Sequence, residues 1–397
     1  MASGGAWPGG RSARPHPAYS AVDYSTAPNP TSRPARRFTL TYGLAAAGFF
    51  LCWVVLAFFL GVDLGLRTAA LAAAFSALPL FVVVPTLLWL DRLETEPTRY
   101  LLFAFLWGSL CAPVGALFLN TGVHLFFQAT GAEDPMTLSA VWTAPPVEEG
   151  LKGLGVLLIL LFRRQEFDGV IDGVVYAGLV GAGFAFSENI LYLGRAYQEY
   201  GIAGLNAVFV LRCIMAPFAH PLFTACTGIG LGLAASVART LPGRVGFALG
   251  GYCCAVLLHA IWNMSASVGQ YETMYFAFQM PVFMGFVVLV VVMRLREASL
   301  IRRYLSQYAD AGWLTHYEVG MLASLSQRRA ARTWARANGG SVGVASMRAF
   351  QDAASDLALL RARIVRGSAE PKARERELAL LGAITAHRRG FVGSPVA

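Results

Sequence analysis

The chain has 397 residues, of which 56% are hydrophobic and only 14% are charged. Its mean hydropathy is +0.53. Soluble domains usually carry about 25% charged residues, so this composition excludes an ordinary soluble enzyme. Repeated apolar runs of roughly 20 residues instead predict an all-α, polytopic membrane protein. A transmembrane β-barrel is not expected, because its strands would alternate in polarity over about ten residues.

The net charge of +9 lies entirely in the C-terminal part of the chain. Residues 1–293 hold 15 basic and 15 acidic side chains, whereas residues 294–397 hold 17 basic and 8 acidic ones. Cytoplasmic segments of membrane proteins are enriched in Lys and Arg, so this distribution predicts a cytoplasmic C-terminal end. Nucleic acid is not an expected partner, because no recognised nucleic-acid-binding motif accompanies the charge.

In chain order, residues 1–36 come first and are rich in Gly, Pro, Ser and Arg. This composition predicts a disordered cytoplasmic tail. A membrane domain of residues 37–296 follows, and arginines gather in every second connection between its apolar runs, which places both termini in the cytoplasm. About eight membrane helices are predicted, at residues 38–60, 68–90, 100–127, 138–162, 170–194, 206–235, 245–268 and 274–293.

Residues 297–397 predict a small, basic, helical cytoplasmic domain. Within Val344–Arg366, apolar residues recur at helical spacing, which indicates one buried helix face. The flanking arginines allow contact with anionic membrane lipid. A plain helical appendage is the alternative. The apolar positions of this face are Met347, Phe350, Ala354, Leu357 and Ile364.

Ionisable side chains inside membrane spans are functional candidates, because each costs several kcal/mol near the bilayer centre. The span 138–162 contains Glu148 and Glu149, the predicted catalytic residues, and Lys152. Glu148 and Lys152 are four residues apart, so they share a helix face and can pair. Glu149 projects about 100° away and is expected to lack that partner. Such a carboxylate suits general acid–base chemistry, although a structural ion pair with one protonated glutamate is the alternative.

The next three spans each add a polar group. Glu188 lies deep in the fifth span, His220 lies in a proline-flanked stretch of the sixth, and His259 shares a helix face with Asn263 in the seventh. The Asn263 amide can orient the imidazole or hold a water molecule. At about 1.5 Å per residue, Glu149, Glu188 and the two histidines fall roughly 10–20 Å below the outer face. Four helices can therefore converge on one site.

Several motifs together carry a resemblance to a known family. In chain order they are Asp91–Pro97, Glu148-Glu149-x-x-Lys152, Phe184-x-x-x-Glu188-Asn189, His220 and His259-x-x-x-Asn263. Their order and spacing resemble the PrsW family of intramembrane proteases over roughly residues 85–295. That family is similar to the CAAX prenyl endopeptidases and to the APH-1 subunit of γ-secretase. Lys152 and Glu188 depart from the CAAX pattern, which argues against a prenylated cysteine as substrate.

The resemblance implies an intramembrane endopeptidase of the bacterial plasma membrane. Its substrate would be a single-pass membrane protein, such as an anti-sigma factor cleaved during stress signalling. In one version of the mechanism, Glu188, His220 and His259 bind Zn²⁺, a ligand set of the kind found in catalytic zinc sites. Glu149 or Glu148 would then take the proton of the attacking water.

Other versions remain open at the level of sequence. Without a metal, the two glutamates would activate water directly, while the histidines and Asn263 bind the oxyanion. A noncatalytic membrane scaffold resembling APH-1 would keep its function after the glutamates are replaced. A proton- or metal-coupled transporter would use the same acids and histidines as a relay.

Overall fold

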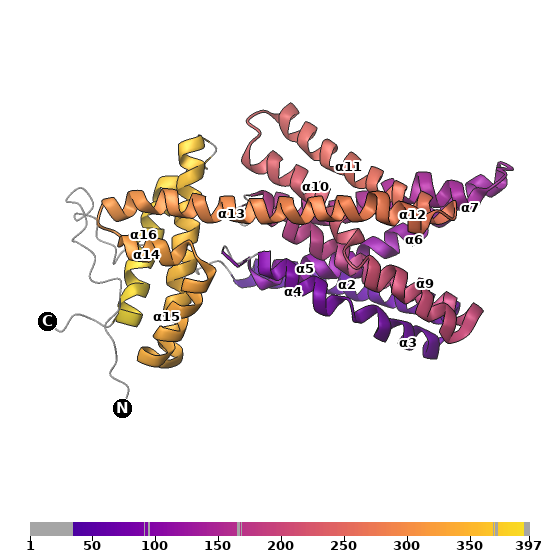
Figure 1. The fold of residues 1–397 in the computed structure, drawn as a ribbon, viewed down its shortest axis with the longest axis horizontal. Helices are drawn as coiled ribbons and strands as arrows, with labels where there is room; N and C mark the ends of the chain where they lie inside the picture. The colour runs from indigo at the N-terminus through magenta and orange to yellow at the C-terminus, as the bar shows by residue number, and fades with distance from the viewer. Residues whose placement is uncertain are drawn as a thin grey trace. The chain divides into compact units, whose positions relative to one another are not determined.

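The structure is a computed structural model that describes residues 35–392, apart from 91, 94–95, 165–166, 168, 368 and 370–371. Residues 1–34 of the predicted disordered tail therefore lie outside the described residues, as do Asp91, Glu94 and Thr95 of the Asp91–Pro97 motif. Every element in the described ranges is helical, as predicted (Figure 1). The chain divides into two compact units, and the smaller unit contains Arg92–Thr95 and Val290–Ala397.

The larger unit comprises Pro34–Asp91 and Glu96–Leu289. Some of its segments are π-helical and carry the label η. Its first half contains α2 (Ala35–Leu64), α3 (Leu66–Ala77), α4 (Leu80–Leu90), α5 (Thr98–Leu106), η2 (Trp107–Cys111) and α6 (Ala112–Ala129). Its second half contains α7 (Pro135–Leu138), η3 (Ser139–Thr143), α8 (Ala144–Phe162), α9 (Val170–Phe209), η4 (Val210–Met215), α10 (Ala219–Ser236), α11 (Leu241–Ser267), α12 (Tyr271–Met274), η5 (Tyr275–Gln279) and the start of α13 (Met280–Asp310).

Among the described residues, five helical segments are long and apolar enough to cross a membrane, and the bent pair α3–α4 makes up to a sixth. The predicted spans 170–194 and 206–235 both fall within one of these segments, Val170–Ser236. The predicted span 138–162 corresponds mainly to η3 and α8, which carry three ionisable side chains. These findings fit a polytopic membrane protein, while the number of eight spans and the cytoplasmic termini stay predictions.

The chain reverses at Gly201 inside α9, where φ is 63° and ψ is −149°. Glycine permits this positive φ because it has no Cβ. Arg212 of η4 hydrogen-bonds Asn189, so the chain after Gly201 runs back along the first part of α9. The returning segment is then non-helical between Met215 and Ala219. Such interrupted helices occur at membrane depth where they line a cavity or are buried in protein.

Glycines allow α9 and α10 to approach closely. A Cβ added to Gly173 of α9 would overlap the carbonyl oxygen of Gly228 on α10, and the reverse substitution would overlap Gly173. Further along, a Cβ on Gly181 would lie 2.6 Å from the carbonyl oxygen of His220. Small residues at such crossings are typical of membrane helix pairs. They bring the start of α10, which carries His220, against the middle of α9.

The smaller unit has its own apolar core. Of the predicted apolar face, Met347, Phe350, Ala354 and Leu357 are fully buried in this core, which confirms the helical pattern of that segment. One residue of the core, Leu93, comes from the connection before α5 and is 2% exposed. The unit is built from the end of α13 and from α14 (His316–Leu322), α15 (Leu325–Arg366) and α16 (Ala373–Val392).

Arg328 of α15 ties the connection at Leu93 to this core. The buried guanidinium donates through Nε to the carbonyl oxygen of Leu322 at 2.7 Å and through Nη1 to that of Leu93 at 2.8 Å. Ser355 also donates to the Leu93 oxygen at 2.7 Å. Burial lowers the pKa of Arg328 to about 10, as expected for a cation removed from water. The Leu93 backbone is thus one of the anchors of the smaller unit.

Candidate active site

Glu148 and Glu149 lie in the second turn of α8, a helix that begins at Ala144 and carries a proline within its first two positions. Proline suits the start of a helix, because the first amide groups need no partner within the helix. Both glutamates are buried, with 7% and 0% exposure. The sequence Pro145-Pro146 thus starts the helix that presents two carboxylates to the interior of the larger unit.

Lys152 lies one turn further along α8 and is fully buried. Its Nζ is 2.7 Å from Oε1 of Glu149 and 3.8 Å from Oε2 of Glu148. The predicted pair of Glu148 and Lys152 is therefore present, but the expectation that Glu149 lacks this partner is wrong. The physical reason is that residues three apart also face each other on a helix. Lys152 consequently contacts both carboxylates.

His259 of α11 contacts the same carboxylates. Its Nδ1 lies 3.0 Å from Oε1 of Glu149, and its Nε2 lies 3.8 Å from Oε2 of Glu148. The hydroxyl of Thr224 on α10 donates to the second oxygen of Glu149 at 3.0 Å. The imidazole stacks on Phe223 with ring centroids 5.3 Å apart. Because a carboxylate only accepts, Nδ1 of His259 is the donor in this hydrogen bond.

The two glutamates differ in their partners. Both oxygens of Glu149 are hydrogen-bonded, as the contacts to Lys152, Thr224 and His259 show. Glu148 accepts a hydrogen bond at Oε1 from Asn120 of α6 at 3.2 Å. Its Oε2 is buried and has no hydrogen-bond partner among the residues that the structure describes. Glu148 therefore has an oxygen available to a further donor.

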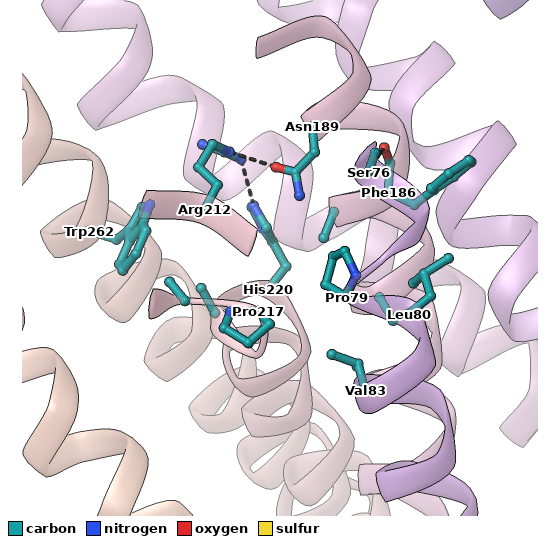
Figure 2. Close-up of a pocket in the computed structure, with 14 residues that line it drawn as sticks. Ser76, Pro79, Leu80, Val83, Phe186, Asn189, Arg212, Pro217, His220 and Trp262 are labelled. Carbon is teal, nitrogen blue, oxygen red and sulfur yellow. Dashed lines mark hydrogen bonds between the residues drawn. The ribbon is translucent and has the colours of Figure 1, made fainter. Parts of the chain in front are cut away.

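His220 joins α8 to a second charged group. Its Nδ1 lies 3.1 Å from Nζ of Lys152, and its Nε2 lies 2.8 Å from Oε2 of Glu188. An ammonium group only donates, so Nδ1 accepts and Nε2 donates to Glu188. Arg212 forms an ion pair with the same Glu188 oxygen and donates through Nε to Asn189 at 2.7 Å. Figure 2 shows the guanidinium next to both Asn189 and His220.

A small cavity of about 20 Å³ lies beside His220, and Asn189 and Arg212 also line it (Figure 2). A cavity needs about 10–15 Å³ of free space to hold one water molecule, and the water needs two to four polar partners. The cavity therefore has the size and the polar groups for a water molecule next to the imidazole.

One cluster in the described part of the chain has the composition of a metal site. The ligand atoms of Glu149, His220 and His259 all lie within 4.8 Å of one another, and all three residues are buried. Two imidazoles and one carboxylate form a ligand set known from catalytic zinc sites. The composition thus fits a metal ion, although Nδ1 of His220 accepts from Lys152 and would become a ligand only once the ammonium moves away. The sequence-based set had Glu188 in place of Glu149, and in the structure Glu188 is paired with Arg212 instead.

The structure brings the predicted residues together with one exception. Contacts link Glu149, Glu188, His220 and His259, as the similar depths predicted. Asn263 of α11 instead donates to the carbonyl oxygen of Ala140 at 2.8 Å, which ties α11 to η3.

Three polar partners of the site have no role predicted from the sequence. Arg212 was noticeable as a charge within an apolar span. Asn120 and Thr224 carry no such signal, since neutral polar residues are common in membrane helices.

Two comparisons with known proteins point to the same family. The family model described as PrsW family intramembrane metalloprotease matches residues 96–293. A protein named Protease PrsW from Oceanobacillus iheyensis is 30% identical over 169 residues, which cover 43% of this chain and 71% of that protein. Proteins of the same name from Geobacillus kaustophilus and Clostridioides difficile are 31% and 28% identical, over 36% and 38% of this chain and 58% and 62% of their own lengths. No solved structure matches the chain.

The matched region contains Glu148, Glu149, Glu188, His220, His259 and Asn263. It ends before α14, so most of the smaller unit lies outside it. The bacterial relatives and the apolar helices confirm the predicted multi-pass localisation in a bacterial membrane. The order of the motifs, the buried cluster of acids and histidines and these matches agree, and the chain belongs to the PrsW family of intramembrane metalloproteases.

Proposed function

We propose that this chain is an endopeptidase that hydrolyses peptide bonds within membrane-anchored proteins. The observation that carries the proposal is the buried cluster of Glu149, His220 and His259, with ligand atoms within 4.8 Å of one another, next to a glutamate that has an available oxygen. Peptide hydrolysis needs an activated water molecule, a proton carrier and a group that stabilises the oxyanion. The residues around this cluster can supply each of these functions.

Glu149, His220 and His259 would hold the metal ion, and their two imidazoles and one carboxylate suit Zn²⁺. When bound, such an ion acts as a Lewis acid and lowers the pKa of water. Glu148 is the proposed general base, because its buried Oε2 can accept a proton from the attacking water and later give it to the leaving amine. This assignment selects one of the two glutamates that the sequence left open.

Arg212 and Glu188 are proposed to position His220. Glu188 accepts from Nε2 of His220 at 2.8 Å and is held in turn by Arg212, so the ring orientation depends on both residues. Nη2 of Arg212 lies 3.5 Å from the same ring nitrogen and provides positive charge beside the small cavity. A fixed positive charge at this place favours an oxyanion that develops next to it.

The proposed substrate is a single-pass membrane protein, such as an anti-sigma factor. The site lies within apolar helices, so a substrate has to reach it as a membrane-embedded segment. Membrane lipid is the expected partner of the basic smaller unit. The smaller unit lies mostly outside the family match, so its role is proposed from its charge alone.

The test is a cleavage assay with the full-length chain in liposomes and a panel of single-pass reporters that contain anti-sigma-factor membrane segments. We expect the wild type to cleave at least one reporter, Glu148→Gln to be inactive with its metal retained, and Glu149→Gln to lose both activity and metal. Glu133→Gln is the control, because Glu133 is exposed between α6 and α7. Cleavage by Glu149→Gln at the wild-type rate, or ion flux without cleavage, would contradict the proposal.

A further inference from the structure

A larger cavity of about 250 Å³ lies next to the site, between α10, α11 and the segment η5–α13. Its wall includes Ala216, Pro217 and Ala219, from the non-helical break and the start of α10, and Trp262 of α11. The same four residues also line the small cavity beside His220. The two cavities therefore share a wall, so a group bound in the larger one lies beside the small cavity next to His220.

The lining of the larger cavity is mainly apolar and aromatic. Leu222 and Phe223 of α10, Leu258 of α11 and Phe283 of α13 contribute to it. An engineered apolar cavity of about 150 Å³ binds benzene, so this cavity has room for an aromatic or a long aliphatic side chain. Its aromatic walls suit such an occupant, because ring contacts add to the burial of apolar surface.

Gln279 of η5 lines the cavity and provides one polar contact. The Ser265 hydroxyl donates to the carbonyl oxygen of Trp262 at 2.7 Å, so its oxygen accepts from Nε2 of Gln279 at 3.1 Å. This arrangement fixes the carboxamide and leaves Oε1 as an acceptor. That oxygen is buried and has no hydrogen-bond partner in the described part of the chain. A well-matched occupant would bring an N–H or O–H group as well as apolar surface.

The cavity wall is held in place by two tyrosines. Tyr275 of η5 donates to the carbonyl oxygen of Met215 at 2.7 Å, and Tyr271 of α12 donates to that of Leu211 at 3.3 Å. Both acceptors belong to η4, directly before the break that leads to His220. The opposite walls of the cavity are thus connected by hydrogen bonds, which fixes its width.

We infer that this cavity binds a large apolar side chain of the substrate next to the scissile bond, while Gln279 accepts a hydrogen bond from a substrate backbone N–H. The inference rests on the proposed function and names the part of the substrate that is recognised. Membrane segments are rich in such side chains, and a segment must expose backbone N–H groups before it can be cut. A lipid acyl chain would fill the space equally well but offers no donor to Gln279.

The first test compares two substitutions on the same helix. Leu258 lines the cavity and is half-buried, whereas Leu249 is 56% exposed and is not one of the lining residues. The reporters differ in the residues on either side of the scissile bond, where each position carries Phe, Leu, Ala or Gly in turn. We expect Leu258→Trp to lower kcat/KM about tenfold for Phe and Leu at one such position and about twofold or less for Ala and Gly. Leu249→Trp should leave kcat/KM unchanged for all of these reporters.

Gln279→Leu tests the polar contact. Because the backbone N–H is common to all reporters, this substitution should lower kcat/KM by the same factor across the panel. Equal effects of Leu258→Trp and Leu249→Trp, or no effect of Gln279→Leu, would overturn the inference.

A binding experiment separates this inference from the proposed function. Benzoylphenylalanine is placed at position 258 or 249 of the Glu148→Gln variant and is irradiated with a reporter in phosphatidylcholine vesicles. We expect a cross-link to the reporter from position 258 alone. A cross-link to phospholipid instead would overturn the substrate pocket. Cross-linking to the reporter without cleavage by the wild type would support substrate binding in the cavity and contradict the proposed protease activity.

Discussion

Lys152 donates a hydrogen bond of 2.7 Å to Oε1 of Glu149, and both side chains are fully buried. The same ammonium lies 3.1 Å from Nδ1 of His220. Two of the three candidate metal ligands therefore contact one lysine. A divalent cation at these ligands would be repelled by the ammonium, since like charges at such distances interact strongly in a low-dielectric interior. Lys152 thus orders Glu149 and His220 but opposes a second cation beside them.

The first prediction concerns Lys152→Met. In the presence of a chelator, the substitution removes the lysine partner of the buried Glu149 carboxylate. Breaking such a buried ion pair typically lowers the free energy of unfolding by about 3–5 kcal/mol. Added zinc should restore most of that loss, because the metal compensates the carboxylate. Melting temperatures measured with EDTA and with zinc should therefore differ more for the variant than for the wild type.

Lys372→Met is the control for this prediction, because Lys372 is exposed and is the other lysine of the chain. Equal melting temperatures of the two variants in EDTA would contradict the role given to Lys152.

The second prediction distinguishes the two possible acidic ligands. Glu188→Gln should retain metal, because Glu188 lies outside the cluster of Glu149, His220 and His259, and the amide oxygen of Gln can still accept from Nε2 of His220. His220→Ala and Glu149→Gln should each lower the metal content at least tenfold, since each removes a ligand. Metal content of the purified proteins by mass spectrometry is the measurement. If Glu188→Gln loses metal while Glu149→Gln keeps it, the ligand set predicted from the sequence is the correct one.

The sequence was sufficient for the helical class and for the convergence of Glu149, Glu188 and the two histidines. It was not sufficient for the partners within the site. Glu148 and Glu149 lie four and three residues before Lys152, and both spacings allow contact on a helix, so only packing decides which pair is closer. The contact of Arg212 with Glu188 depends on the chain reversal at Gly201, and no periodicity in the sequence encodes that reversal.

The third prediction concerns the crossing of α9 and α10. Gly173→Ala should destabilise the protein by about 1–3 kcal/mol, the usual cost of extra volume in a packed interior. The added methyl group would overlap the backbone of Gly228, which cannot move aside as a side chain can. Thermal unfolding in detergent measures the effect.

Gly246→Ala on α11 is the matched control, because a Cβ there has nothing within 4 Å. Helix propensity alone should make this variant slightly more stable. An unchanged melting temperature for Gly173→Ala would show that the two helices can separate at little cost.

The fourth prediction concerns Arg328→Met in the smaller unit. The substitution leaves the buried carbonyl oxygen of Leu322 without its guanidinium donor and weakens the contact at Leu93. We expect a loss of about 3 kcal/mol or more, because hydrogen bonds to charged groups contribute roughly 1.5–3 kcal/mol each. Faster backbone hydrogen exchange in α15 and α16 would report the loss. Arg329→Met should leave exchange unchanged, since Arg329 is exposed.

Because Leu93 belongs to the core of the smaller unit, it limits where the chain can be truncated. A fragment that starts at Val290 would contain every helix of the smaller unit but not the Leu93 side chain or its carbonyl oxygen. A chain that stops before Val290 would leave the same leucine exposed on a connection between membrane helices. Both truncations cut through one apolar core, although neither cut falls inside the site. Supplying residues 91–97 as a separate peptide should therefore stabilise the isolated C-terminal fragment.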